Sequence, residues 1–327
     1  MAFSYHKQET KYTCGAAAMR MALEAGILLF NLESTQEMEA LNQCAGEMGK
    51  KAPVALRVNP DVDPRTHPYI STGLKQNKFG IDIKRSLEAY RQARELNNLE
   101  IRGVDCHIGS QLTSVEPFVE SIRRLKILIE KLDQELGLHI QYLDLGGGLG
   151  ITYEEEAPPH PADYARALLS ELPERDLTLI LEPGRVIVGN AGVLVTRVLY
   201  LKEGEGKHFV IVDAGMNDLA RPCLYGSYHG IQPVMKKDCS EFVADVVGPI
   251  CESGDFLAKG RSIPDVEQGE LLAVMSAGAY GFSMSSNYNS RTRAAEVLVK
   301  GKEFYVIRER ETLEDLIRGE AIPLFLR

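Results

Sequence analysis

The stretch Tyr142-Leu143-Asp144-Leu145-Gly146-Gly147-Gly148-Leu149-Gly150 shows the pattern that decides the fold: a short apolar run passes directly into a loop. Similar runs, each ending in a polar or glycine-rich loop, occur at residues 27–31, 54–59, 103–107 and 177–182. Most are apolar almost throughout, as strands buried on both faces should be. We therefore predict a parallel sheet, either doubly wound or a (β/α) barrel.

The segments between these runs carry helix signals. Ser34, followed three residues later by Glu37, forms a capping-box pattern at a helix start. Five apolar residues recur at helical spacing in a later segment: Phe118, Ile122, Leu125, Ile129 and Leu132. Because the five runs are fewer than the eight strands of a closed barrel, we expect an α/β fold: a (β/α)8-type barrel truncated to about five βα units.

Beyond about residue 190, the alternation of apolar runs and helical segments ends. The next strand candidates are shorter and separated by turns: 193–202, 208–213, 271–274 and 296–299. This pattern predicts a mostly antiparallel C-terminal β domain. We therefore expect three parts: an unrelated N-terminal segment over 1–22, a partial barrel over 23–190 and a β domain over 191–327.

Composition limits the partners. The 327 residues carry a formal net charge of -9, which argues against nucleic acid because phosphate backbones are also negative. No run approaches the roughly 20 apolar residues of a spanning helix, and the N-terminus lacks a secretory-signal layout, so we expect no membrane partner. The six cysteines are sparse and indicate reduced thiols, which favours a cytoplasmic location. We predict no metal site.

Candidate binding groups follow three of the predicted strands, at the end where such sheets bind ligands. The loops are His107-Ile108-Gly109-Ser110-Gln111, Gly146–Gly150 and Glu182-Pro183-Gly184-Arg185. Glycines there let backbone N–H groups approach a phosphate closely. A tight turn without a ligand explains such glycines equally well. A dinucleotide site would need the spacing G-x-G-x-x-G, which residues 146–150 do not provide.

Glu182 and His107 each allow two interpretations. Glu182 could form an ion pair with Arg185 at the barrel mouth. It could instead anchor a protonated ring nitrogen, which makes a cofactor a better electron sink. A histidine beside a strand end is most often a structural group, but a flat cofactor could stack on its ring.

Three further clusters lie in the predicted β domain. They are Asp213–Asp218 leading into Arg221–Tyr225, Cys251–Asp255, and Gly278–Gly281 leading into Asn287–Arg291. Arginine suits the bidentate recognition of a carboxylate. Each cluster also has a structural interpretation: Cys251 as a buried inert thiol, Arg291 as part of a solvated strand face and Tyr280 as core packing.

Taken together, these motifs resemble the diaminopimelate decarboxylase family, which belongs to the alanine-racemase-like, fold type III pyridoxal-phosphate enzymes. The resemblance runs from about Ala22 to Arg327 and rests on five motifs in the family's order. They begin at His107, Gly146, Glu182, Cys251 and Tyr288. The resemblance implies decarboxylation of meso-2,6-diaminopimelate to L-lysine and CO2, with pyridoxal 5'-phosphate as the cofactor.

The resemblance also implies which residues bind the cofactor. His107 would stack on the pyridine ring, and Glu182 would pair with the ring nitrogen. Ser110, Gly146, Gly147, Gly148 and Tyr280 would hold the phosphate, and Gly184 would also bind the cofactor.

For the substrate, the resemblance implies that Arg185, Arg221 and Tyr225 hold a carboxylate, and that Tyr280 also binds the substrate. Glu252 would meet the distal amine, and Cys251 would act at the α-carbon. In the family this cysteine comes from the neighbouring subunit, so the active unit would be a homodimer with shared active sites.

One family feature does not occur in this sequence. In the family, a lysine in a Tyr-Ala-x-Lys-Ala-Asn-like motif at the end of the first barrel strand forms a Schiff base with the cofactor. That motif is absent here, and Lys75 and Lys78 lie in a different βα loop. The alternative hypothesis is therefore a catalytically inactive paralogue that binds pyridoxal phosphate or a partner.

The first residues resemble a different family. Gln8 and Cys14 have the spacing found at the start of papain-like peptidases that process bacteriocin leaders. A thiol peptidase also needs a His base and an orienting group from a domain of its own, which about 22 residues cannot build. We therefore interpret residues 1–22 as a remnant of a fusion or gene rearrangement.

Overall fold

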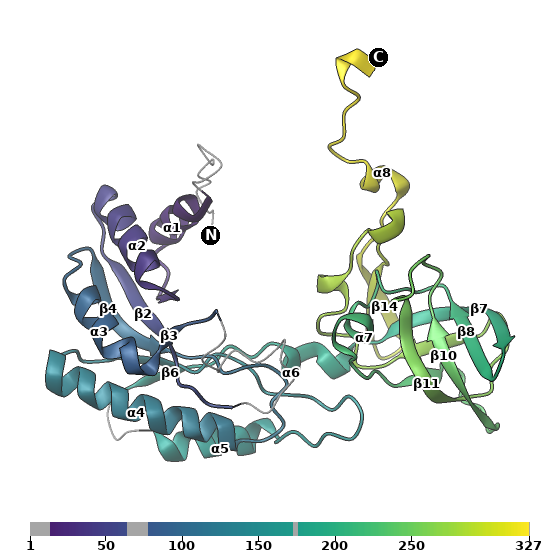
Figure 1. Ribbon diagram of the computed structural model, residues 1–327, viewed down its shortest axis with the longest axis horizontal. Coiled ribbons are helices and arrows are strands. Elements are labelled where there is room, and N and C mark those ends of the chain that lie inside the picture. The colour runs from purple at the N-terminus through teal and green to yellow at the C-terminus, as the bar shows by residue number, and fades with distance from the viewer. Residues whose placement is uncertain (1–13, 64–77, 173–175, 327) are drawn as a thin grey trace. The chain divides into compact units, whose positions relative to one another are not determined.

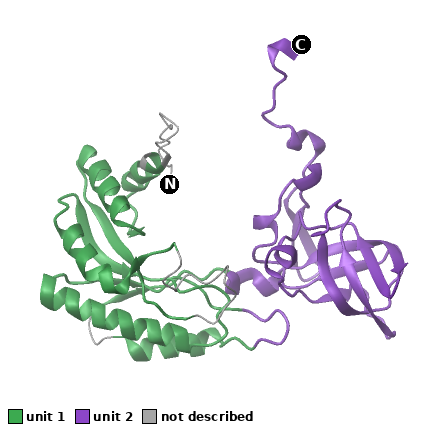
Figure 2. Ribbon diagram, viewed as in Figure 1, with its two compact units in different colours: residues 1–150, 157–184 green, residues 151–156, 185–327 purple. Residues whose placement is uncertain are grey.

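The computed structural model describes residues 14–63, 78–172 and 176–326, so Gln8 and Lys75 lie outside the described residues. The chain divides into two compact units (Figure 2). The first consists of Met1–Gly150 and Ala157–Gly184, and the second of Ile151–Glu156 and Arg185–Arg327. The predicted boundaries at residues 22 and 190 stay predictions.

The first unit is built on a parallel sheet with the strand order β1-β2-β4-β5-β6, and the short β3 pairs with β2. Its elements are α1 Cys14–Ala25, β1 Phe30–Leu32, α2 Thr35–Glu47, β2 Ala52–Asn59, β3 Ile81–Asp82, α3 Ile83–Arg94, β4 Leu99–Asp105, α4 Glu116–Leu136, β5 Tyr142–Asp144, α5 Pro161–Glu171 and β6 Thr178–Ile180. The predicted α/β class, with about five βα units, is confirmed. The two-residue strand β3 was not predicted.

Strand β2 shows why these strands are apolar almost throughout. Val54, Leu56 and Val58 are fully buried on one side of the sheet, and Ala55 is fully buried on the other. Burial of each larger side chain contributes about 2 kcal/mol to folding. Both sides of this central strand are therefore largely buried, and Arg57 is the charged residue within it.

The helices follow the predicted signals. Ser34 caps α2 by accepting the backbone N–H of Glu37 at 3.3 Å. Helix α4 ends at Gly137, whose φ of 63° is the left-handed conformation that favours glycine. The predicted apolar face of α4 is confirmed, since its members are at most 2% exposed: Phe118, Ile122, Leu125, Ile129 and Leu132. Helices α3, α4 and α5 contact one another in turn (Figure 1).

The second unit contains a six-stranded sheet with the order β11-β10-β8-β7-β12-β9 and a separate hairpin of β13 and β14. Its elements are α6 Arg185–Val188, η2 Gly189–Ala191, β7 Leu194–Gly204, β8 Lys207–Val212, α7 Arg221–Tyr225, β9 Ile231–Pro233, β10 Glu241–Val247, β11 Phe256–Pro264, β12 Leu271–Val274, η3 Phe282–Met284, η4 Tyr288–Ser290, β13 Glu296–Lys300, β14 Glu303–Arg308, α8 Leu313–Leu316 and η5 Leu324–Leu326. Neighbouring strands are antiparallel except β8 and β10, which are parallel.

The mostly antiparallel prediction for this unit is therefore confirmed, although strands β9, β10, β11 and β14 were not predicted. Its core is formed by branched side chains such as Val198, Val210, Val246 and Val274, each at most 1% exposed. Among the described residues, no helix has the length and apolar character needed to cross a membrane.

Candidate functional site

The carboxyl ends of the parallel strands in the first unit carry a group of interacting side chains, here named the strand-tip cluster. Its members are Asn31, Glu33, Arg57, Asp105, His107, Asp144 and Glu182. The amide of Asn31 donates to Asp144 at 3.0 Å. Arg57 forms an ion pair with Glu33 at 2.5 Å and lies 4.0 Å from Asp105. Side chains from successive strands therefore meet at one edge of the sheet, as in other parallel-sheet proteins.

The glycine loop after β5 fits against its neighbours without room for side chains. The carboxylate of Asp144 accepts the N–H of Gly146 at 2.9 Å and holds the turn. A Cβ atom on Gly147 would lie 2.2 Å from the carbonyl oxygen of Glu182. A Cβ atom on Gly148 would lie 2.5 Å from the carbonyl oxygen of Gly109. The loops after β4, β5 and β6 are therefore in direct contact.

Most of the predicted cofactor residues lie in these three loops. The structure brings His107, Glu182 and the glycines of residues 146–148 together, and Ser110 follows Gly109 in the loop after β4. Gly184 is exposed and is the last residue of the first unit. Their roles toward a cofactor stay predictions.

His107 is held as a neutral imidazole. The backbone N–H of Gly147 donates to its Nδ1 at 3.2 Å, so the ring proton must lie on Nε2. Burial, followed by the charge of Arg57, lowers the pKa of His107 to about 4. The ring is therefore uncharged at neutral pH, and this suits a flat group stacked on its face.

The strand-tip cluster contains more carboxylates than cations. Burial and the neighbouring Asp144 raise the pKa of Asp105 to about 8, even though Arg57 lies close by. Glu182 is exposed, and partial burial of its carboxyl group together with the neighbouring Asp144 raises its pKa, with Arg57 opposing them. A cationic group beside Glu182 would relieve this repulsion, so the electrostatics favour a ligand with a protonated nitrogen at this position.

The second unit contains a contrasting group, here named the arginine cluster: Tyr153, Arg185, Arg221, Tyr225, His229 and Tyr280. The Arg221 guanidinium carbon lies 5.0 Å from the ring centroid of Tyr153, 5.8 Å from that of Tyr225 and 6.0 Å from that of Tyr280. The Arg185 guanidinium carbon lies 4.8 Å from the Tyr280 centroid and 5.6 Å from the Tyr153 centroid. The predicted substrate residues Arg185, Arg221, Tyr225 and Tyr280 are therefore brought together.

The two arginines are buried beside each other, at 4% exposure for Arg185 and 5% for Arg221. Burial and the neighbouring Arg185 lower the pKa of Arg221. Within the described part of the chain, Arg221 has no carboxylate partner, and its buried Nε has no hydrogen-bond acceptor. Aromatic ring faces offset only part of such a charge. Two adjacent buried guanidinium groups therefore suit a bound carboxylate. Tyr280, which stacks on Arg185, has a φ of 58°, rare for a tyrosine.

Cys251 and Glu252 lie on another loop of the second unit, between β10 and β11. The buried carboxylate of Asp255 accepts the backbone N–H of Ile250 at 2.6 Å and fixes the loop. Cys251 and Glu252 themselves are exposed, and Glu252 accepts the hydroxyl of Tyr288 at 3.2 Å. The interpretation of Cys251 as a buried thiol is therefore wrong; a fixed loop presents the thiol and a carboxylate at the surface.

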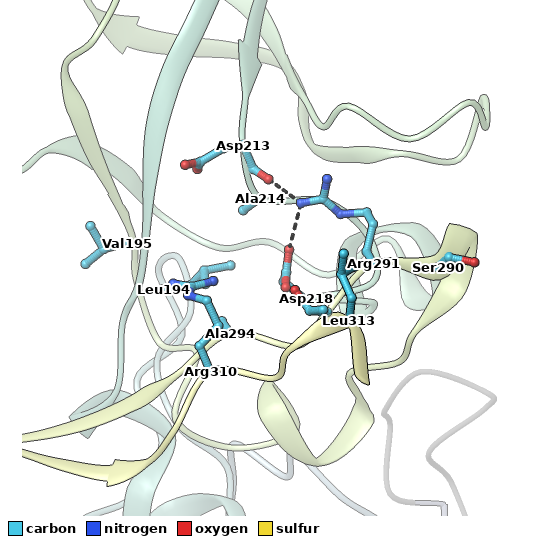
Figure 3. A pocket seen from close by; sticks show the side chains of 11 residues that line it. Leu194, Val195, Asp213, Ala214, Asp218, Ser290, Arg291, Ala294, Arg310 and Leu313 are labelled. Atoms are coloured by element: carbon cyan, nitrogen blue, oxygen red, sulfur yellow. Dashed lines mark hydrogen bonds and ion pairs between the residues drawn. The ribbon is translucent and has the colours of Figure 1, made fainter. Parts of the chain in front are cut away.

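Arg291, from the last sequence motif, lines a cavity of about 390 Å³ in the second unit (Figure 3). Its guanidinium donates to the backbone carbonyl of Asp213 at 2.5 Å and to the side-chain oxygen of Asn217 at 3.0 Å. It also lies 3.9 Å from the carboxylate of Asp218. Arg291 therefore ties neighbouring loops together, and the interpretation as a solvated strand face is wrong.

Comparison with known proteins now identifies the family. A family model described as "Pyridoxal-dependent decarboxylase, pyridoxal binding domain" matches residues 10–189, more than half of the chain. The diaminopimelate decarboxylase of Pseudomonas aeruginosa is 58% identical over 304 residues, which are 93% of this chain and 73% of that relative. The chain belongs to the diaminopimelate decarboxylase family. The resemblance drawn from the five motifs is thereby confirmed.

Solved diaminopimelate decarboxylases have the same fold. The Helicobacter pylori enzyme complexed with L-lysine has a TM-score of 0.87 and 44% identity, over 93% of this chain and 75% of that one. The M. jannaschii enzyme in co-complex with L-lysine has a TM-score of 0.88 and 41% identity, over 95% and 73%. Nothing in these comparisons supports the hypothesis of an inactive paralogue.

Several residues of both clusters were not predicted from the sequence. Arg57 and Asp105 interrupt apolar runs, and a charged residue within a buried strand is a signal that could have identified them. Tyr153 and His229 carry no such signal, because their surroundings suggest an ordinary loop. Their place in the arginine cluster follows only from the folded structure, in which Tyr153 contacts Arg221 and His229 contacts Tyr153.

Proposed function

We propose that the chain catalyses the pyridoxal-phosphate-dependent decarboxylation of meso-2,6-diaminopimelate to L-lysine and CO2. The observation that carries this proposal is the pair of buried arginines, Arg185 and Arg221, in a chain of this family. A substrate with a carboxylate at each end offers one group for the arginines to bind and another to lose as CO2.

The strand-tip cluster and the loops beside it, which carry Ser110 and residues 146–148, fit the cofactor. Backbone N–H groups in residues 146–148, with Ser110, would hold the phosphate, since the glycines leave no side chain in the way. Neutral His107 would stack on the ring, and Glu182 would keep the ring nitrogen protonated. Pyridoxal phosphate, when bound, supplies an electron sink for the electron pair left at the α-carbon as CO2 departs.

The second unit would bind and protonate the substrate. Arg185, Arg221 and Tyr225, with Tyr280, would hold a carboxylate through charge-assisted hydrogen bonds. Glu252 would bind the distal ammonium group. The Cys251 thiol would donate the proton that the α-carbon needs once CO2 has left.

A homodimer accounts for the exposure of Cys251 and Glu252. The fixed loop that carries them would reach the site of the partner subunit, so each site would use residues from both copies. We propose this arrangement for the active enzyme, and a mass measurement by light scattering tests it. A cytoplasmic location remains a prediction from the sequence.

The function is tested by incubating the purified chain with pyridoxal phosphate and measuring CO2 and lysine. Release of both from meso-diaminopimelate, but not from the LL isomer that lacks a D-centre, is the expected result. Because the sequence has no Tyr-Ala-x-Lys-Ala-Asn motif, a second arm adds methylamine as a source of primary amine. If neither arm releases CO2 although the chain binds the cofactor, the proposal is wrong.

A further inference from the structure

Two aromatic groups of the arginine cluster have no role in the proposed function. Tyr153 lies in the loop after the glycine turn, and this loop belongs to the second unit. His229 follows α7 and is completely buried. Their rings meet edge to face, with centroids 5.2 Å apart and an interplanar angle of 75°.

Tyr153 contacts both arginines. Its hydroxyl oxygen accepts a hydrogen bond from Nη1 of Arg185 at 2.5 Å. Its ring lies 5.6 Å from the Arg185 guanidinium carbon and 5.0 Å from that of Arg221. One tyrosine therefore orients the first guanidinium through its hydroxyl and attracts both guanidinium groups through its ring.

The loop that carries Tyr153 is fixed by its own hydrogen bonds. The carboxylate of Glu156 accepts the backbone N–H groups of Tyr153 at 2.9 Å and of Glu154 at 2.7 Å. The amide of Asn190 donates to the carbonyl of Thr152 at 2.8 Å. The tyrosine thus has a defined position before any ligand arrives.

His229 supports Tyr153 from behind and is itself fixed. Its Nδ1 lies 2.9 Å from the carbonyl oxygen of Met275, and because a carbonyl can only accept, Nδ1 carries the proton. Burial, with the charges of Arg221, Arg185 and Arg261, lowers the pKa of His229 to about 4. A neutral ring adds no third positive charge beside the two arginines.

We propose that Tyr153 is a positioning residue for substrate carboxylate binding: it holds Arg185 and Arg221 side by side, with His229 fixing its ring. Like charges buried next to each other repel, so the pair needs an acceptor and a ring face that hold it in place. The ligand class is a carboxylate at one end of an amino acid. This inference rests on the proposed function.

Tyr153→Phe tests the inference because it keeps the ring and removes only the hydroxyl. The matched control is Tyr200→Phe, since Tyr200 is 60% exposed and lies on β7 outside the cluster. The probes are pimelate, which has two carboxylates and no amine, and 1,5-diaminopentane, which has two amines and no carboxylate. Calorimetry measures the Kd of each for the full chain with pyridoxal phosphate.

In Tyr153→Phe we expect about tenfold weaker pimelate binding, and in turnover an about tenfold higher KM with kcat changed less than about twofold. Binding of 1,5-diaminopentane and of pyridoxal phosphate should not change. A general loss of structure would weaken the binding of these two ligands as well, so they serve as controls. His229→Asn keeps a donor for Met275 and should retain pimelate binding, whereas His229→Leu should weaken it.

Two results would overturn the inference, and only the second would also contradict the proposed function. If the wild-type chain binds pimelate and Tyr153→Phe binds it equally well, this inference alone is wrong. If the wild-type chain does not bind pimelate at all, the assignment of Arg185 and Arg221 in the proposed function fails too.

Discussion

The strand-tip cluster of the first unit and the arginine cluster of the second unit hold excess charge of opposite sign. In the first, four carboxyl groups, those of Glu33, Asp105, Asp144 and Glu182, lie near Arg57, which is the one cation of the cluster as defined from the described residues. In the second, two guanidinium groups are surrounded by tyrosine rings. Among the described residues, carboxyl groups outnumber cations in the strand-tip cluster, and Arg221 of the arginine cluster forms no ion pair.

The difference indicates what each cluster is built to receive. A charge taken out of water costs free energy unless a partner offsets the loss. The carboxylate-rich cluster suits a protonated ring nitrogen, and the arginine cluster suits a carboxylate. Changing a cluster's charge should therefore affect ligand binding more than folding.

The largest effect should follow removal of a charge from the arginine cluster. In Arg221→Met we expect kcat/KM for diaminopimelate to fall by about 10²- to 10³-fold, because the substrate carboxylate loses a buried partner. The melting temperature without ligand should not fall, since an uncompensated buried charge is removed. Arg221→Lys keeps the charge without the forked geometry, so its kcat/KM should lie between those of wild type and Arg221→Met. A variant within tenfold of wild type would contradict the assignment.

The next effect concerns space in the glycine loop after β5, which contacts the strand-tip cluster. Gly147→Ala would place a Cβ atom 2.2 Å from the carbonyl oxygen of Glu182, so the loop must shift. We expect pyridoxal phosphate to bind at least about tenfold more weakly, as followed by its absorbance. Gly15→Ala is the control, because a Cβ atom there meets no atom of the described residues within 4 Å. Equal cofactor binding by Gly147→Ala and wild type would show that the loop does not hold the phosphate.

A smaller effect should appear as pH dependence of stability. The pKa of Asp105 is about 8 in the folded chain, against about 4 when unfolded, so folding takes up a proton between these values. Stability from this group is present at low pH and is lost as pH rises toward 8. The lowered pKa values of His107 and His229 act oppositely, but only below about pH 6.5.

Between about pH 6.5 and about pH 8 we therefore expect wild type to lose about 2 kcal/mol of unfolding free energy that Asp105→Asn does not lose. Urea unfolding at several pH values measures both proteins. Parallel pH profiles for the two would mean that Asp105 is ionised throughout this range.

The smallest effect should come from an ion pair outside both clusters. Arg123 contacts Glu171 through two hydrogen bonds, at 2.6 Å and 3.1 Å, but its side chain is 58% exposed. Water already solvates the Arg123 guanidinium and reaches the Glu171 carboxylate, so Arg123→Ala should leave the melting temperature and kcat/KM nearly unchanged. A large loss would show that exposed pairs matter as much as buried ones here.

The sequence predicted best the parts whose pattern is local. Parallel strands such as β2 are apolar on both sides, and Phe118 to Leu132 repeat at helical spacing, so both could be identified from residues alone. Strand β11, Phe256–Pro264, contains Lys259, Gly260 and Arg261 and takes its conformation from pairing with β10, which no local pattern shows.

The same contrast holds for the sites. The residues named from the sequence, such as His107 and Arg221, lie in motifs with distinctive spacing. Tyr153 and His229 act through contacts between segments far apart in the chain, and their positions follow only from the folded second unit.

The left-handed backbone conformation of Tyr280 affects which substitutions selection would favour at this position. A left-handed tyrosine costs about 1 kcal/mol or more relative to glycine, which adopts this conformation freely. Laboratory evolution for heat resistance alone should therefore replace Tyr280 with glycine or asparagine only if the relief of backbone strain exceeds the lost ring contacts with Arg185 and Arg221, whereas selection for lysine production should keep the aromatic ring. The residue found at this position would then report which of the two pressures a population had experienced.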